Sequence, residues 1–300
     1  MAIALKGDFI GFSFNEHRSE SLGIVRVSDG SRYNEDLVPT TQDKTVQVPG
    51  GDGFYYFGSD YTQRQFSINI AFDELTEKQF RELQQVFGTK ELGKLIFDER
   101  PYKYYMVKSS KPQLKYICFG KDGERIYKGE GTLTFTAYYP FAKSVFKFLN
   151  EYGNKNKDEW KEASGMKAEK GTYDIVSNNG SISVYNAGDL ETDFILKFSL
   201  PDDNTPIGDI KITLSKENVG KVEAFLDLNG FSKKDADTGF QINTKTNLIE
   251  GFNAEGLTGT LYNENITQGD FFKIPPREKG YQISVTGATP IEIVYDYIYY

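Results

Sequence analysis

The sequence predicts a mainly β protein: an antiparallel β-rich N-terminal domain that carries one packed α-helix, followed by a C-terminal β-sandwich or jelly-roll. Three observations predict this class. The 300 residues suffice for two domains, each with its own core. The chain contains 20 Tyr and 23 Phe, residues that suit a pleated, half-buried surface. Thr132–Tyr139 and Ile291–Tyr300 alternate large apolar with polar or small residues, as expected for the last strand of a β-domain.

The first domain is expected to span residues 1–150. Its clearest strand is Phe66–Phe72, in which every second side chain is large and apolar. These four side chains are expected to point into a core. Phe9–Phe14 and Ile24–Val27 are shorter strand candidates.

One helix is expected directly after this strand. Thr76 and Gln79 have the spacing of a capping box, and Gly88 supplies a stop at the other end. One face of the helix is apolar and is expected to pack on the sheet; a partner-binding face is the alternative interpretation. The apolar stripe consists of Phe80, Leu83 and Phe87.

After the helix, four strands are expected, with breaks at prolines and at one Asp-Gly pair. Pro112 is expected to separate two of them, and Asp122-Gly123 favours a tight hairpin because glycine tolerates positive φ. The four strand candidates are Lys94–Asp98, Tyr102–Val107, Leu114–Phe119 and Gly131–Tyr139.

Residues 151–172 are expected to form a linker or an exposed excursion, because Lys, Glu and Asn replace the apolar periodicity there. Trp160, the only tryptophan, lies in this segment. It is a candidate anchor for a partner, since aromatic anchors dominate interfaces. The alternative is that Trp160 packs the linker against a neighbouring domain.

Residues 173–300 are expected to form the second domain, without a convincing helix. Short strands separated by Gly, Asn, Asp and Pro at intervals near ten residues predict two packed sheets. The strand candidates are Ser181–Tyr185, Phe194–Phe198, Ile210–Leu214, Ala224–Leu228, Phe240–Asn243, Leu248–Ile249, Gly259–Tyr262, Asp270–Ile274, Gln282–Val285 and Ile291–Tyr299.

Composition narrows the functional classes. The formal charge of −8 argues against nucleic-acid binding, which relies on Lys and Arg. No stretch approaches 18 apolar residues, and Lys6 and Asp8 interrupt the apolar N-terminal segment, so we expect a soluble chain made in a cytoplasm. Cys118, the only cysteine, cannot form an intramolecular disulfide and is expected to be buried in a strand.

The sequence offers no catalytic, cofactor-binding or metal-binding constellation, and we expect neither an enzyme nor a cofactor. His17 has no nucleophile motif nearby, and a single histidine cannot build a multi-histidine metal site. The glycine-rich segment Val48–Gly53 is not followed by a helix with Gly-Lys-Ser/Thr, so it is interpreted as a turn and not as a phosphate loop.

Several segments occur in an order that resembles a known family, the distal tail proteins of long-tailed phages with non-contractile tails and of related tail-like particles. The resemblance covers nearly the whole chain and depends on the order of its motifs. These are Phe9–Phe12, Val48–Gly53, Tyr61 with Arg64, the capped helix, Lys94–Val107, the Pro140-Phe141-Ala142 boundary, and Asn263–Pro276 before a Tyr-rich last strand.

This resemblance implies a structural virion protein at the tail tip. It implies an N-terminal domain that forms a hexameric ring on the tail tube, and a galectin-like or carbohydrate-module-like C-terminal sandwich. The implied partners are further copies of the chain, the major tail tube protein, a tail-associated protein or fibre, and a receptor-binding protein. No membrane partner is implied.

A ring needs heterologous interfaces that close on themselves. The candidate assembly elements are the helix surface and the segment Thr40–Tyr56, as an arm that pairs with a neighbour by strand addition. The candidate assembly loop within it consists of Val48, Pro49, Gly50, Gly51, Asp52 and Gly53.

Two other functional classes compete with this one. A carbohydrate-binding adhesion module, acting through the second domain, is the alternative function, although a fold does not establish a function. A peptidoglycan hydrolase is disfavoured, because it needs carboxylate, metal or Cys/His machinery that the sequence does not display.

Overall fold

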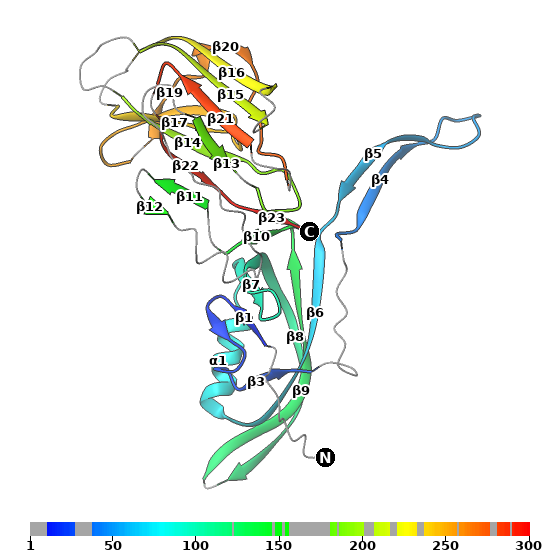
Figure 1. Ribbon diagram of the computed structural model, residues 1–300. Coiled ribbons are helices and arrows are strands. Elements are labelled where there is room, and N and C mark those ends of the chain that lie inside the picture. The colour runs from blue at the N-terminus through cyan, green and yellow to red at the C-terminus, as the bar shows by residue number, and fades with distance from the viewer. Residues whose placement is uncertain are drawn as a thin grey trace. The chain divides into compact units, whose positions relative to one another are not determined.

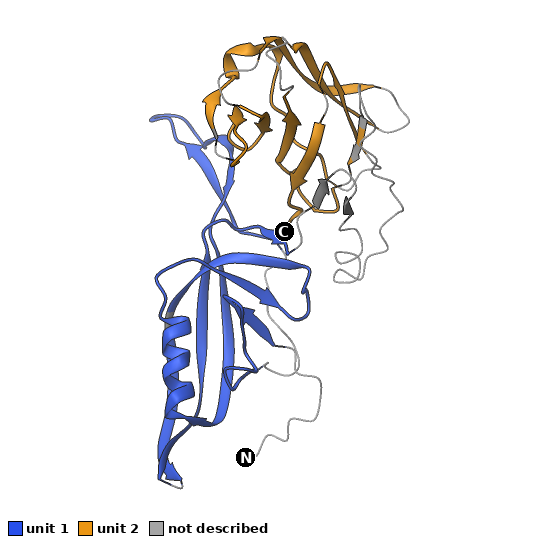
Figure 2. Cartoon of the chain, turned by 90° about the vertical axis from the view of Figure 1, so that its left-hand side faces the viewer, with its two compact units in different colours: residues 1–145, 300 blue, residues 146–299 orange. Residues whose placement is uncertain are grey.

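The computed structural model describes residues 11–27, 38–121, 123–145, 148–151, 154–155, 181–184, 186–200, 207–216, 221–232, 237–256, 258–276, 281–288 and 290–300. The chain divides into two compact units, residues 1–145 with Tyr300 and residues 146–299 (Figure 2). Of the predicted linker, only Glu151, Asn154 and Lys155 belong to the described residues, and Trp160 lies outside them.

The first unit is an antiparallel sheet with the strand order β2-β1-β7-β8-β9-β6-β3, in which β10 also pairs with β8 (Figure 1). A separate two-stranded sheet is formed by β4 and β5. The elements are β1 (Phe12–Phe14), β2 (His17–Arg18), β3 (Ile24–Arg26), β4 (Thr41–Val46), β5 (Tyr55–Tyr61), β6 (Arg64–Thr76), α1 (Glu77–Phe87), β7 (Gly93–Phe97), β8 (Lys103–Lys121), β9 (Glu124–Ala137) and β10 (Ala142–Ser144).

The alternation predicted for β6 is confirmed. Its large apolar side chains are buried on the face that α1 covers, and the residues between them are mostly exposed. A strand with one buried face shows this period of two, because successive side chains point to opposite sides. The buried set is Phe66, Ile68, Ile70 and Phe72.

The predicted helix is confirmed as α1, and its capping box is present. The Gln79 amide donates to Thr76 Oγ1 at 3.4 Å, and the Thr76 amide donates to Gln79 Oε1 at 3.0 Å. These bonds satisfy amides that have no partner inside the helix. Phe80, Leu83 and Phe87 are buried against the sheet, so the stripe belongs to the core. The helix ends before Gly88, as predicted.

The predicted break at Pro112 is wrong. β8 runs without interruption from Lys103 to Lys121, with a shift in its pairing to β9 between Ser110 and Gln113. Proline lacks an amide proton, and sheets accommodate it at edges and bulges. Pro112 lies at this shift in pairing. It also lies on an edge of the sheet, because β7 pairs with β8 only as far as Val107. The hairpin at Gly123 is confirmed, with φ of 84° at that glycine and Lys121 paired to Glu124.

The second unit contains two antiparallel sheets, which confirms the predicted sandwich. One has the order β12-β11-β22-β14-β17-β18-β19 and the other β13-β21-β15-β16-β20. Phe231 of one sheet lies 4.4 Å from Phe240 of the other, between ring centroids. The elements are β11 (Phe148–Glu151), β12 (Asn154–Lys155), β13 (Ser181–Val184), β14 (Phe194–Ser199), β15 (Gly208–Lys216), β16 (Val222–Phe231), β17 (Gly239–Asn243), β18 (Leu248–Phe252), β19 (Thr258–Leu261), η1 (Asn263–Asn265), β20 (Ile266–Gly269), β21 (Tyr281–Thr286), β22 (Pro290–Tyr295) and β23 (Ile298–Tyr299).

Two strand predictions in this unit need correction. The predicted strand Asp270–Ile274 is irregular apart from a bridge between Ile274 and Thr192; β20 comes just before it. The predicted last strand is divided between β22 and β23, where Thr192 Oγ1 donates to the Asp296 carbonyl at 2.6 Å. Neither the irregular backbone of Asp270–Ile274 nor the division of the last strand could be predicted from the local sequence, because both depend on contacts with residues far away in the chain. Among the described residues, no helix is long and apolar enough to span a membrane.

Candidate functional site

The most unusual surface of the first unit is the hairpin of β4 and β5, called here the arm, which projects beyond the end of β6 (Figure 1). Every residue of β4 is exposed, and so is every residue of β5 except Gly58. The predicted assembly loop forms its tip, where the Gly51 amide donates to the Val48 carbonyl at 3.0 Å. Its role in assembly stays a prediction.

The two faces of the arm differ in chemistry. On one face, the Ser59 hydroxyl donates to Asp43 at 2.5 Å and lies 2.7 Å from the Tyr56 hydroxyl. Tyr55 is paired with Val46 and lies on the opposite face, because neighbouring residues of a strand alternate. By the same alternation Phe57 shares that face with Tyr55. One face therefore carries a polar network beside the Tyr56 ring, and the outer half of the other face carries the apolar side chains of Val46, Tyr55 and Phe57.

Four consecutive aromatic residues, Phe54 to Phe57, are exposed on the arm by 64% to 67% each. The predicted assembly segment, Thr40–Tyr56, includes three of these four residues, but the prediction assigns no role to their aromatic rings. The signal was present, since four adjacent aromatic residues in a strand place two on each face and leave no face fully polar. Contiguous exposed apolar surface of this kind marks an interaction site.

The root of the arm is fixed by an aromatic cluster within the first unit. The ring of Tyr61 lies 4.9 Å from that of Phe141 and 6.5 Å from that of Tyr300. A hydrogen bond with Tyr61 raises the pKa of Tyr300, and Lys103 Nζ donates to the Tyr300 backbone oxygen at 3.0 Å. The base of the arm is held in place, whereas its aromatic outer part is exposed.

A second surface of the first unit is the face of the sheet opposite α1. Its side chains on β6 and β9 are hydroxyls and amides, and Thr132 Oγ1 donates to Asn69 Oδ1 at 3.0 Å. Across the centre of these two strands the face carries no charged group. The residues concerned are Gln65, Ser67, Asn69, Thr132, Thr134 and Thr136.

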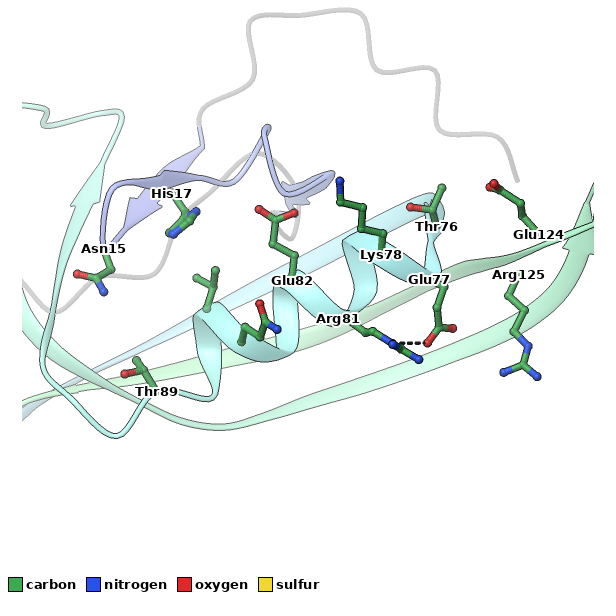
Figure 3. Close-up of a pocket in the computed structure, with 12 residues that line it drawn as sticks. Asn15, His17, Thr76, Glu77, Lys78, Arg81, Glu82, Thr89, Glu124 and Arg125 are labelled. Atoms are coloured by element: carbon green, nitrogen blue, oxygen red, sulfur yellow. Dashed lines mark hydrogen bonds and ion pairs between the residues drawn. The ribbon is translucent and has the colours of Figure 1, made fainter.

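The exposed side of α1 borders an open hollow of about 1280 Å³ (Figure 3). In it Arg81 Nε donates to Glu77 at 2.9 Å, and the Tyr127 hydroxyl donates to the same carboxylate. The hydrogen bond from Tyr127 lowers the pKa of Glu77 and raises the pKa of Tyr127 to about 12. Near neutral pH, Glu77 is a carboxylate and Tyr127 a phenol, so this pair ties the first turn of α1 to β9.

His17 also borders this hollow, next to Asn15 and away from the Glu77 cluster (Figure 3). Within the described part of the chain, no group of three or more His, Cys, Asp and Glu side chains is arranged to hold a metal ion. The prediction for Cys118 is half wrong: it lies in a strand, β8, but is exposed. Only β9 flanks that half of β8 among the described residues.

In the second unit, the outer face of the five-stranded sheet carries one exposed aromatic residue among polar ones. Lys211 Nζ lies 5.2 Å from the centre of the Phe225 ring and 3.4 Å from Asp227 Oδ2. Lys211 on β15 therefore contacts both the ring and the carboxylate, which lie on the neighbouring strand β16.

Residues 23–137 match the family model of the phage tail protein RIFT-related domain. The first unit is therefore similar to this phage tail family over most of its length. The match spans β3 to β9 and therefore includes the arm, α1 and the sheet that carries them. The family resemblance inferred from the order of motifs is confirmed by it.

Among solved structures, the chain is similar to the Dit protein of phage SPP1, described as a paradigm of the hub of the adsorption apparatus in phages that infect Gram-positive bacteria. The identity is 12% and the TM-score 0.59, over 98% of this chain and 100% of that one. This similarity shows a shared fold for both units. A chain of the phage P2 baseplate, in its activated conformation with Ca, has 11% identity and a TM-score of 0.45 over 95% of this chain and 97% of that one. Comparison with curated protein sequences finds no match.

Proposed function

We propose that the chain is a distal tail protein: a structural, non-enzymatic virion component whose first unit forms a hexameric ring between the tail tube and the tail-tip or receptor-binding apparatus. The observation that carries this proposal is the aromatic arm on a phage tail domain. A single two-stranded hairpin is marginally stable in water, and an exposed aromatic hairpin calls for a partner that covers it. In a ring, each arm has a neighbouring copy to cover it.

The position of the arm supports a heterologous contact. Because its root is held by Tyr61 and Phe141, the arm leaves the unit in a defined direction and presents its aromatic residues away from its own core. A surface that meets a different surface of the next copy generates a ring when the rotation closes. The tube protein, a tail-associated protein or fibre, and a receptor-binding protein would then contact the two sides of this ring.

The uncharged centre of this face, on β6 and β9, suits a channel wall within such a ring. A wall of hydroxyls and amides, such as Thr132 and Thr134, does not neutralise phosphates and so does not retain passing DNA. We expect assembled chain to show no retention of short DNA on gel filtration, and Thr134→Arg to introduce it. Strong DNA binding by the unmodified ring would contradict this assignment.

The assembly proposal is tested by light scattering and negative-stain imaging of the purified chain and of a variant that lacks Pro49–Gly53. We expect rings for the unmodified chain and their loss in the deletion, with the far-UV circular dichroism unchanged. The matched control is Val222→Ser with Leu261→Ser, which removes exposed apolar side chains from the second unit and should leave rings intact. A chain that stays monomeric at high concentration and beside tube protein would overturn the proposal.

A carbohydrate-binding adhesion module is the second candidate, and the pair of Phe225 with Lys211 favours it. An exposed ring beside a carboxylate and an ammonium group provides a stacking surface and hydrogen-bond partners for a sugar. We expect Phe225→Ala to abolish any binding of the full chain to host wall polysaccharide. Equal binding by this variant and the unmodified chain would remove this face as the site.

A further inference from the structure

The outer half of β8 is an open sheet edge in the described part of the first unit. From Pro112 to Lys121 the strand pairs with β9 on one side, while β7 has ended its pairing at Val107. Backbone amides and carbonyls on the free side are therefore available to another strand. All of these ten residues except Leu114 are exposed.

An apolar groove runs beside this edge. It has a volume of about 280 Å³ and lies between α1 and β8, with Ile70 and Leu133 of the central strands as its floor. An apolar cavity of about 150 Å³ holds one benzene-sized ring, so this groove has room for about two aromatic rings. Its walls are Phe80, Leu83, Gln84 and Phe87 on the helix and Pro112, Leu114 and Tyr116 on the strand.

Two glycines of β9 leave room for the side chains of β8 that form this wall. Leu114 is paired with Gly131 and Tyr116 with Gly129. A Cβ at Gly131 would lie 2.6 Å from Leu114 Cδ2, and one at Gly129 would lie 2.8 Å from Tyr116 Cβ. The two β8 side chains therefore occupy space that other residues on β9 would fill, and both stand on the side of α1, where Tyr116 lies 5.1 Å from Phe80 between ring centroids.

The arm has the features that such an edge and groove require. Tyr55 and Phe57 are two residues apart on its apolar face, as Leu114 and Tyr116 are on β8, so a strand added to β8 brings the two pairs side by side at the same repeat. The charges are also complementary. Thr41–Tyr61 contains three aspartates and one lysine, whereas the edge Pro112–Lys121 contains two lysines and no acidic residue.

Resting on the proposed ring, we propose that the arm of one copy adds as a strand to the edge Pro112–Lys121 of β8 in the next copy, with Tyr55 and Phe57 inserted in the groove between α1 and β8. Main-chain hydrogen bonds then give affinity, and the groove fixes the register. The second copy is the occupant because the arm supplies the free strand edge, the alternating aromatic side chains and the opposite charge.

The single natural cysteine provides the test, because Cys118 lies on the same edge and is exposed. In Phe54→Cys a second thiol stands beside the two inserted residues without replacing them. A short bismaleimide added to rings of this variant should give a ladder of covalent dimers and higher species. The ladder should vanish in Phe54→Cys with Cys118→Ser, and in Val222→Cys, where the added thiol lies in the second unit.

A second variant tests the groove. Leu114→Trp should fill it and raise the concentration needed for half-assembly by roughly tenfold or more, the scale of an interface hot spot. Ile117→Trp is the matched control: it lies on the same strand, but three residues on and therefore on the opposite face, so it should assemble normally. Both variants are to be checked for an unchanged melting temperature.

The outcomes separate this inference from the ring itself. Rings of Phe54→Cys that form without any cross-link to Cys118 of a neighbouring copy, or rings that tolerate Leu114→Trp, would overturn the arm-to-groove contact while the ring stands. A cross-link confined to the monomer band would show that the arm folds onto its own copy, and would also overturn it. Absence of rings in the unmodified chain would instead contradict the proposed function.

Discussion

Two hairpins of the first unit, β4–β5 and β8–β9, differ in their surroundings. β9 is flanked by β6 and β8 and covered by α1, so side chains such as Phe135 are fully buried. The arm has neither a third strand nor a covering helix among the described residues, and its aromatic residues are exposed. Similar local sequence, rich in Tyr and Phe, thus gives a core in one place and a surface in the other.

The difference shows that burial depends on what lies against a strand and not on its composition. A two-stranded sheet needs a third strand or a helix to be stable, and β9 has both within its own unit. The arm contains the same types of side chain without that support. It is held at its root, through Tyr61, and the missing layer must come from another molecule if its apolar face is to be buried.

The largest expected effect comes from truncating the supported hairpin. Phe135 contacts Phe12, Phe14 and Phe87, with ring centroids 5.1 to 6.3 Å apart. Phe135→Ala should lower the free energy of unfolding by about 3 to 5 kcal/mol, because it removes a buried ring and leaves a cavity. Urea titration followed by circular dichroism measures this. A loss below about 1 kcal/mol would mean that the core around β9 is not formed.

A smaller effect is expected at the start of the helix that supports β9. Thr76→Ala removes the hydroxyl that accepts from the Gln79 amide, and it should cost about 1 kcal/mol. Thr76→Ser is the matched control, because serine caps a helix equally well. Equal losses for both variants would show that the methyl group of Thr76, and not the cap, is what matters.

The supported parts of the fold could be predicted from sequence because their signals are local. The alternation in β6 and the spacing of Thr76 and Gln79 both lie within a few residues of chain. The continuity of β8 through Pro112 could not be predicted, because the edge position that tolerates the proline depends on where β7 ends. The exposure of Cys118 has the same origin.

The candidate site was only partly predictable for a related reason. The turn Val48–Gly53 is marked by glycines, so its place at the tip of a hairpin follows from local chemistry. β4 gives no such signal, since its sequence is polar up to Val46 and lacks the alternation of a half-buried strand. The pairing of Val46 with Tyr55 and the shift near Lys44 then decide which aromatic residues share a face, and both depend on the partner strand.

The hydrogen bond between Tyr127 and Glu77 makes the stability of the supported hairpin depend on pH. Its folded-state pKa is raised from 10.0 to about 12 by the hydrogen bond with Glu77, so the stabilising contribution is complete below pH 10 and is lost as the pH rises towards 12. For Glu77, whose pKa is lowered, the contribution is complete above the ordinary value of 4.5 and is lost in acid.

Tyr127→Phe should therefore be less stable than the unmodified chain near neutral pH, and the gap should narrow between pH 10 and 12. Unfolding in urea at a series of pH values measures the gap. Tyr116→Phe, an exposed tyrosine near the same helix, is the control and should track the unmodified chain. A gap that stays constant through this range would contradict the role of the Tyr127 hydroxyl.

The smallest expected effect on stability is at the unsupported hairpin. Phe57 is 67% exposed, so Phe57→Ala should change the free energy of unfolding by no more than about 0.5 kcal/mol when measured at concentrations where the chain is monomeric. The same change should weaken self-assembly, because the aromatic ring is then missing from the contact between copies that would bury it. Loss of stability in the monomer comparable to that of Phe135→Ala would show that the arm is already covered within its own unit. Aromatic residues of the two hairpins would then serve the same purpose, and the case for an arm that needs a neighbour would fail.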